Sequence, residues 1–271
     1  MDIESKKFLG QPKNFVSIFN ALLFDGQPVL KPEYLKDENS ELVMNVSSKH
    51  VDIIKRYEDG TYLDLFVIES QSYVDQCMVA RVMEYECVAR MRYIRQNFKK
   101  HVPMHTRLPM ILTVVLYVGE SKWNAAKRLS ELEIIHPGFE DMFNEFKLNL
   151  IELNTNHKYN TGEKATQDFF DLLRMIYRKQ ILKENLDREF NRDALYFAYV
   201  VTKNKELLNI YQESEKGDVK VCRALDEMFE ESTNKGIQMG IKHSIALNQF
   251  EVYQTMLDKG FNVKLSHQSL Q

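Results

Sequence analysis

The fold is decided by one stretch of the sequence, residues 51–72, which reads VDIIKRYEDGTYLDLFVIESQS. Two runs rich in β-branched and aromatic residues, 51–57 and 62–72, flank the pair Asp59-Gly60. Asp-Gly between two such runs predicts a β-hairpin, because a type I′ turn needs φ > 0 at both central residues. We therefore expect this stretch to form the centre of a sheet.

The predicted hairpin brings acidic side chains to one face of that sheet. With a two-residue turn, Asp52 lies opposite Val67, and residues opposite one another share a face. Side chains two residues apart on a strand also share a face, so Glu69 and Gln71 project on the side of Asp52. Glu69 is then a diagonal neighbour of Asp52, at roughly 7–8 Å between backbones. At that separation two carboxylates can share one Mg²⁺, which accepts carboxylates together with waters and a phosphate oxygen.

Glu69 needs a partner in any arrangement, because its strand is apolar on both faces and an unpaired buried carboxylate is costly or stays protonated. The sequence leaves three arrangements open: a cation shared with Asp52, a salt bridge to Arg81 or Lys55, or a position at a solvated strand end. Spacing alone favours the salt bridge or the strand end, because carboxylates near strand ends are common.

The other elements of the first 155 residues give a mixed α/β pattern. An amphipathic helix is predicted at 14–24 and a long helix at 76–98. Strands are predicted at 41–46, 109–119 and 147–153, of which the second is bounded by Pro and Gly. Helices and strands therefore alternate around the hairpin, as they do in a sheet covered by helices.

The pattern changes after residue 155. Residues 154–162 are rich in Asn, Thr and Gly and predict a linker. From residue 163 onward the periodicity is helical, with few Pro or Gly breaks. We therefore predict an α/β domain at 1–155 and an all-helical C-terminal region at 163–271.

The composition excludes several classes of protein. A chain of 271 residues with 44% hydrophobic and 28% charged residues is typical of a globular protein and not of a disordered or collagen-like one. Its three cysteines, Cys77, Cys87 and Cys222, form no C-x-x-C pair, which excludes a zinc ribbon and fits a reducing compartment. No apolar run approaches the ~20 residues that a membrane span requires. We expect a cytoplasmic protein without a membrane segment.

The net charge of −3 gives no overall attraction to nucleic acid, so any contact with DNA has to be local. Arg92, Arg95 and Lys99 are spaced i, i+3, i+7 and so share one face of the helix predicted at 76–98. They form either a ridge that contacts DNA phosphates or a solvated helix end, where cations also suit the helix dipole.

Several motifs together resemble one known family. The run IESQS at 68–72, followed by Met78, Arg81 and Tyr85, resembles the I-E-x-Q-S … M-x-x-R-x-x-x-Y signature of the recombination-promoting nuclease (Rpn) family. These proteins are also described as YhgA-like transposases of the PD-(D/E)XK nuclease family. Further segments similar to that family lie at 14–26, 31–35, 108–123 and 148–152. The resemblance covers most of residues 5–260.

The resemblance implies a restriction-endonuclease-like αβββαβ core and a metal-dependent nuclease site. Asp52 takes the place of the first acidic residue of the family motif, Glu69 that of the second, and Gln71 the position that is Lys in the wider superfamily. Asp52, Glu69 and the backbone carbonyl of Ser70 would bind Mg²⁺, for which Mn²⁺ is a possible substitute. Gln71 cannot take a proton, so it could only position the attacking water or a phosphate oxygen.

Two further residues have a supporting place in this site. Arg81 and Tyr85 lie one turn apart on the helix after the strand, where they either orient Glu69 or a phosphate or form a structural Arg–Glu pair. The sequence also departs from the family, since Ser17 stands where members often carry an acidic residue, and the tail after Phe261 looks truncated.

The leading hypothesis is a magnesium-dependent DNA endonuclease associated with recombination or mobile elements. The alternative is a catalytically silent, decayed member of the family that acts as a binding protein and self-associates through the helical region. The acidic overall charge favours the alternative, whereas the retained Asp52, Glu69 and Gln71 favour the nuclease.

Overall fold

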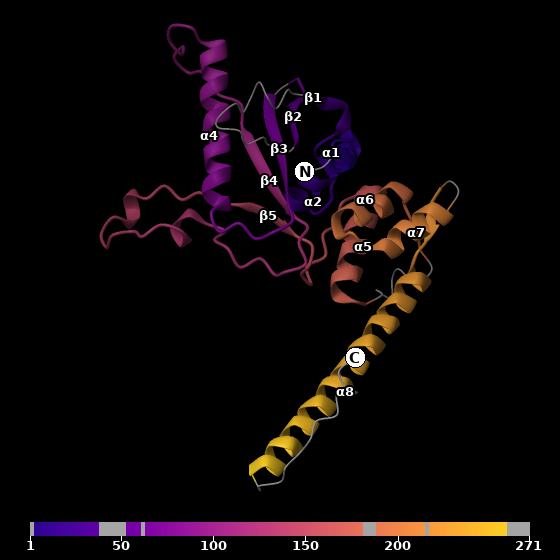
Figure 1. Cartoon of the computed structure of the whole chain (residues 1–271). Coiled ribbons are helices and arrows are strands. Elements are labelled where there is room, and N and C mark those ends of the chain that lie inside the picture. The colour runs from indigo at the N-terminus through magenta and orange to yellow at the C-terminus, as the bar shows by residue number, and fades with distance from the viewer. Residues whose placement is uncertain (1–2, 38–52, 61–62, 181–187, 215–216, 259–271) are drawn as a thin grey trace. The chain divides into compact units, whose positions relative to one another are not determined.

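A five-stranded mixed sheet forms the centre of the fold, in the order β1-β2-β3-β4-β5 (Figure 1). The computed structural model describes residues 3–37, 53–60, 63–180, 188–214 and 217–258. The strands are β1 (Leu35–Asp37), β2 (Ile53–Glu58), β3 (Leu63–Gln71), β4 (Ile111–Tyr117) and β5 (Asn149–Glu152). β1, β2 and β3 pair antiparallel, whereas β3, β4 and β5 pair parallel. The sheet confirms the predicted mixed α/β class.

The hairpin of β2 and β3 forms as predicted, but in another register. Ile54 is the partner of Val67, where a two-residue turn predicts Asp52. Asp52 itself lies outside the described residues. The register differs by two residues, so every described side chain of the hairpin keeps its predicted face, since the side-chain period of a strand is two.

The turn explains this difference. The last described pair is Glu58 with Leu63, whereas a turn at Asp59-Gly60 pairs Glu58 with Thr61. A type I′ turn needs positive φ at both central residues. Gly60 has a φ of 90°, but Asp59 is not among the described residues with positive φ, so the predicted type I′ turn centred on Asp59-Gly60 is wrong.

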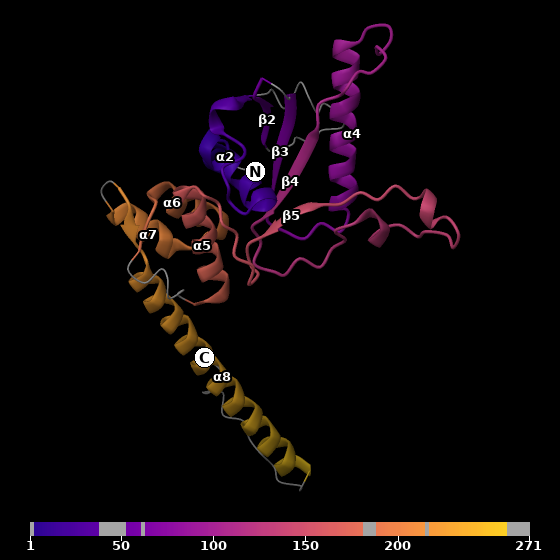
Figure 2. The same ribbon diagram turned by 180° about the vertical axis from the view of Figure 1, so that it is seen from behind.

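Helices cover both faces of the sheet. They are α1 (Ile3–Leu9), α2 (Pro12–Phe24) and α4 (Met78–Asn97). On one face, Tyr85 of α4 belongs to the same buried cluster as Val67 of β3. On the other, the ring centroid of Phe19 in α2 is 4.9 Å from that of Phe66. Figures 1 and 2 show α4 and α2 on opposite sides of the sheet, so alternate residues of β3 face different helices.

Most predicted elements of the first 155 residues are confirmed. The helices predicted at 14–24 and 76–98 correspond to α2 and α4, and the strands predicted at 109–119 and 147–153 to β4 and β5. The strand predicted at 41–46 lies outside the described residues. The described residues also form short 3₁₀ helices, η1 (Pro32–Tyr34), η2 (Leu129–Glu131) and η3 (Glu140–Met142).

The sequence predicts an all-helical region after residue 163, but the structure also contains two short strands among the residues it describes there. Its elements are α5 (Lys164–Arg178), β6 (Glu189–Phe190), α6 (Arg192–Thr202), α7 (Lys205–Glu213) and β7 (Val219–Lys220). β6 and β7 pair antiparallel, and strands of two residues are too short for periodicity to reveal. α5 and α6 pack on the N-terminal helices: Ser17 Oγ donates to Thr166 Oγ1 at 2.8 Å, and Phe8 stacks on Phe197. The predicted division into 1–155 and 163–271 stays a prediction.

The chain ends its described part in one long helix, α8 (Cys222–Asp258). The helical periodicity predicted for this part of the sequence is confirmed, and α8 is continuous over 37 residues. The chain divides into two compact units, residues 1–222 and 223–271, so almost all of α8 belongs to the second. Among the described residues, no helix is long and apolar enough to cross a membrane.

Candidate functional site

The candidate site lies at the carboxyl end of β3, the central strand of the sheet. Glu69, Ser70 and Gln71 are the last three residues of this strand. Glu69 and Gln71 project on the same face as Val67, which is the face covered by α4. Both are buried, with 5% of Glu69 and 4% of Gln71 exposed. The predicted pair of polar residues is therefore inside the protein and not at a solvated strand end.

The carboxylate of Glu69 is paired with a cation from α4. Arg81 Nη2 lies 3.2 Å from Glu69 Oε1. The sequence leaves several arrangements open for Glu69, and this contact confirms the salt bridge to Arg81. The salt bridge to Lys55 is wrong, because Lys55 Nζ lies 2.6 Å from a carboxylate oxygen of Asp37. Lys55 pairs with Phe66 in the sheet and so belongs to the opposite face from Glu69.

Arg81 is the centre of a wider network. Its guanidinium also donates to the carboxylate of Asp75 and, from Nη2, to Tyr85 Oη at 2.9 Å. Burial lowers the pKa of Arg81, but the hydrogen bonds to Asp75 and Tyr85 outweigh it and leave that pKa raised. Burial raises the pKa of Tyr85, although the hydrogen bond from Arg81 opposes the shift. Arg81 therefore stays charged and Tyr85 keeps its proton at neutral pH, which suits both to holding Glu69 in place.

Gln71 has unused hydrogen-bonding capacity. Its Nε2 atom is buried and has no hydrogen-bond partner among the residues that the structure describes. A buried amide donor without a partner costs free energy, roughly 1–3 kcal/mol. A ligand oxygen at this strand end would satisfy it. This unsatisfied donor is the feature of the site that points most directly to a bound group.

The residues at the end of β3 supply some, but not all, of the ligands that a metal needs. Carboxylate and carbonyl oxygens are the donors that Mg²⁺ prefers, and Glu69 and Ser70 offer one of each. Within the described residues, no group of three or more His, Cys, Asp or Glu could hold a metal ion. Asp52, the other predicted ligand, lies outside them. The described donors are of the kind that a hard cation prefers, but by themselves they do not form a metal site.

The predicted basic ridge does not belong to this cluster. Arg81 contacts Glu69 near the start of α4, whereas Arg92 and Arg95 follow in its last turns. At about 1.5 Å per residue, Arg95 lies about 21 Å along the helix from Arg81. Lys99 follows the end of the helix at Asn97. The ridge is therefore at the other end of α4, and only an extended ligand can reach both.

Two buried or partly buried carboxylates near the site, Asp75 and Glu86, are not among the predicted site residues. Asp75 accepts hydrogen bonds from the backbone N–H of Cys77 at 2.9 Å and from Arg81. The first of these bonds closes an Asx turn before α4, whose N-cap is Cys77, and an Asp just before a predicted helix is a sequence signal for such a turn. Glu86 of α4 accepts a hydrogen bond from the backbone N–H of Thr113 at 3.0 Å. Burial raises the pKa of Glu86, although that hydrogen bond and Arg90 oppose the shift.

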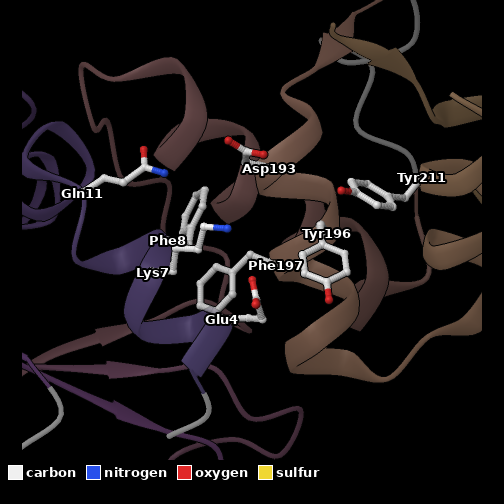
Figure 3. Close-up of a pocket in the computed structure, with 8 residues that line it drawn as sticks. All are labelled: Glu4, Lys7, Phe8, Gln11, Asp193, Tyr196, Phe197 and Tyr211. Carbon is white, nitrogen blue, oxygen red and sulfur yellow. The ribbon is translucent and has the colours of Figure 1, made fainter. Parts of the chain in front are cut away.

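A cavity of about 190 Å³ lies elsewhere, between α1, α6 and α7 (Figure 3). Four aromatic rings and four polar side chains line it: Phe8, Tyr196, Phe197, Tyr211, Glu4, Lys7, Gln11 and Asp193. None of the predicted site residues is among them. The cavity is therefore separate from the cluster at the end of β3.

Comparison with known families gives one match. Residues 33–206, more than half of the chain, match the family described as "Putative transposase, YhgA-like". The matched segment includes β3, all of α4 and every residue of the Arg81 network. No curated protein and no solved structure matches the chain.

Proposed function

The chain belongs to the YhgA-like family of putative transposases, and on that premise we propose that it is a magnesium-dependent endonuclease that hydrolyses phosphodiester bonds of DNA. The family description associates the chain with mobile elements, whose movement requires breakage of DNA strands. The observation that carries the proposal is the pair of buried polar side chains at the end of β3, where Glu69 is held by Arg81 and the amide donor of Gln71 has no partner among the described residues.

The proposed metal ligands are Asp52, Glu69 and the backbone carbonyl of Ser70. Asp52 directly precedes Ile53 in the sequence, and Ile53 pairs with Ile68, which directly precedes Glu69. The carboxylate of Asp52 adds the second charge that the described residues do not supply.

The charge balance supports a divalent cation. Arg81 is one positive charge in contact with two carboxylates, Glu69 and Asp75. With Asp52 the site would carry three carboxylates and one guanidinium, and so two net negative charges. Mg²⁺ cancels such a charge, and its preference for oxygen ligands fits this donor set.

Each residue then has one role in the reaction. When bound, Mg²⁺ would neutralise the scissile phosphate and lower the pKa of a nearby water. Glu69 and Asp52 would hold the Mg²⁺ ion in position. Arg81 fixes the rotamer of Glu69 through the contact at 3.2 Å. Gln71 donates from Nε2 to a phosphate oxygen or to the attacking water, and it cannot act as a base because an amide takes no proton at neutral pH.

A second candidate function is a catalytically silent binding protein. The observation in its favour is the Arg81 network itself, which pairs Glu69 without any metal. Such a protein would associate with a second copy of the chain through its helical region. Exposed apolar side chains lie along α8 there: Ile237, Met239, Ile241, Ile245, Leu247, Phe250 and Val252. The two functions make opposite predictions for metal binding and for DNA cleavage.

The test is nicking of supercoiled plasmid by the purified chain with Mg²⁺, Mn²⁺ or EDTA. Glu69→Gln and Asp52→Asn are expected to lower the nicking rate by roughly 100-fold or more, as loss of one electrostatic contact to a transition state does. Glu152→Gln is the matched control, because Glu152 is also buried at a strand end and is held by Trp123 N–H and Lys127.

Metal binding is measured separately as the rise in melting temperature on addition of Mg²⁺. Asp52→Asn is expected to abolish the rise, and Glu152→Gln to keep it. Equal nicking by wild type and Glu69→Gln would assign the activity to a contaminant. That outcome, or no nicking with either metal, would reject the nuclease and favour the binding protein.

A further inference from the structure

The second half of α4 and the loop that follows it project from the sheet. Burial along α4 ends at Ala89, and no later residue of the helix is buried. Figure 1 shows this end of α4 and its loop extending beyond the strands. We name residues 90–110 the α4 arm.

The α4 arm is strongly basic, although the chain as a whole is acidic. No Asp or Glu occurs from Cys87 to Gly119. Six basic residues lie in the arm: Arg90, Arg92, Arg95, Lys99, Lys100 and Arg107. Arg95, Lys99 and Arg107 are exposed, and in the described part of the chain their side chains make no ion pair or hydrogen bond with another residue. Their charges are therefore available to an anionic partner.

The loop of the arm presents an apolar side chain at its tip. Met104 is 85% exposed. The turn around it is closed by a hydrogen bond from Thr106 N–H to the carbonyl of Pro103 at 3.2 Å. His105 has a φ of 66°, in the left-handed region that few residues other than Gly enter. Met104 is therefore an exposed apolar side chain within a hydrogen-bonded turn.

We propose that the α4 arm grips duplex DNA, with its cations against the phosphates and Met104 inserted as a wedge between bases in the minor groove. The inference rests on the proposed function for its choice of partner. Lys and Arg that neutralise phosphates supply most of the affinity for DNA, and proteins that bind the minor groove often insert Met or another apolar side chain between base steps.

A membrane surface is the other partner that takes cations together with apolar side chains. Segments that bind such a surface carry a continuous apolar face along a helix. The helical part of the arm instead alternates Arg90, Met91 and Arg92, and the most exposed apolar residue lies in a turn. The arm therefore fits DNA better than a membrane.

The position of the arm gives a footprint. About 21 Å separates Arg81 from Arg95 along α4. At about 3.4 Å per base pair, this length corresponds to about six base pairs. A duplex that contacts both the arm and Glu69 must therefore lie along α4. The arm would hold it about six base pairs from the bond to be cleaved.

The charge part of the proposal is tested by fluorescence anisotropy of a labelled 30-base-pair duplex with the full chain in EDTA, where no cleavage interferes. The triple variant Arg95→Gln, Lys99→Gln, Arg107→Gln is expected to lower the slope of log K against log salt by about 1 for each cation removed. The control Lys6→Gln, Lys7→Gln, Lys13→Gln removes the same charge from exposed positions on α1 and α2, and is expected to keep the slope. An equal decrease of the slope in both variants, or no decrease in the arm variant, would overturn the proposal.

The wedge is tested with 2-aminopurine placed in the duplex, since an inserted side chain unstacks the base and raises its fluorescence. Met104→Ala is expected to abolish the rise and to leave the salt slope unchanged. Met142→Ala is the matched control, because Met142 is 77% exposed at the end of η3, outside the arm. A rise that survives in Met104→Ala would reject the wedge.

Vesicles of anionic phospholipid separate the two partners. If the chain binds the vesicles more tightly than the duplex and the arm variant abolishes that binding, the arm is a membrane contact and the proposal is wrong. Because binding is measured without metal, loss of the nuclease activity alone leaves this test intact. A chain that nicks plasmid but whose arm variant binds DNA as the wild type does would reject only the arm.

Discussion

The two halves of α4 differ in burial and in the partners of their charged side chains. In the first half, from Met78 to Ala89, six side chains are buried and Arg81 is committed to Glu69, Asp75 and Tyr85. In the second half none is buried. Arg95 makes no ion pair within the described part of the chain. The first half anchors the helix and shapes the candidate site, whereas the second half offers its charges to a partner.

The helix dipole does not account for the cations of the second half. Cations near a helix C-terminus are stabilising, but the effect falls off within the last turn. Arg95 lies in that turn. Lys99, Lys100 and Arg107 follow the end of the helix at Asn97, so the dipole gives them little. The difference between the two halves therefore points to a partner, and matched substitutions in the two halves can test it.

The largest difference is expected from two methionines of α4. Met78 is fully buried and Met91 is 44% exposed. Met78→Ala removes packed atoms from the cluster with Val115 and Trp123, and is expected to lower the free energy of unfolding by about 2–5 kcal/mol. Met91→Ala is expected to stay within about 0.5 kcal/mol. Urea denaturation of both variants measures the difference, and equal losses would show that the second half is packed as well.

The next difference is expected from two arginines. Arg81→Ala leaves Glu69 and Asp75 without their shared cation. Loss of one partner from a fully buried pair costs roughly 3–5 kcal/mol, and because the side chain of Arg81 is 20% exposed we expect about 2–3 kcal/mol. Arg95→Ala is expected to cost less than about 0.5 kcal/mol. If Arg81→Ala were as mild as Arg95→Ala, the network would not anchor the site.

Glu86 allows a test by pH. Burial raises its pKa in the folded chain, so between the ordinary pKa of Glu and this raised value the folded state binds more protons than the unfolded state. Stability contributed by this group is therefore lost as the pH rises through that window. Glu86→Gln cannot ionise and is expected to gain stability relative to the wild type as the pH rises.

The measurement is urea denaturation of wild type and Glu86→Gln between pH 4 and pH 7, a range that follows from the ordinary pKa of Glu near 4.3 and an upward shift. Glu84→Gln, an exposed carboxylate on the same helix, serves as control and is expected to follow the wild type. A constant difference between Glu86→Gln and wild type would contradict the burial of this carboxylate.

The fold of the first 155 residues was largely accessible from the sequence, and the exceptions have physical causes. The runs of β-branched and aromatic residues in β2 and β3 and the 3.6 period of α4 identify these elements without tertiary information. The register of the hairpin depends on whether Asp59 takes positive φ, and the dipeptide Asp-Gly does not decide that. Because the difference is two residues, the prediction that Glu69 and Gln71 share a face with Val67 is correct despite the wrong turn.

The candidate site was only partly accessible. The spacing of Arg81 and Tyr85 predicts that they share a helix face, and both join the Glu69 network. The choice between Arg81 and Lys55 could not be made from spacing, because it depends on which face each strand residue takes after pairing. That the basic ridge lies far from Glu69 follows from the rise of the helix, so the sequence already held this information.

The smallest effect on stability is expected from the α4 arm. The triple variant Arg95→Gln, Lys99→Gln, Arg107→Gln changes exposed side chains that have no ion-pair partner in the described part of the chain. Its free energy of unfolding is expected to stay within about 0.5 kcal/mol of the wild type, while its salt slope for DNA falls by about 1 per cation. Removing like charges from one arm also relieves their mutual repulsion. A slight gain in stability is therefore also consistent with cations that do not stabilise the fold. A loss comparable to that of Arg81→Ala would mean that these cations hold the fold together, and the contrast between the two halves of α4 would then fail.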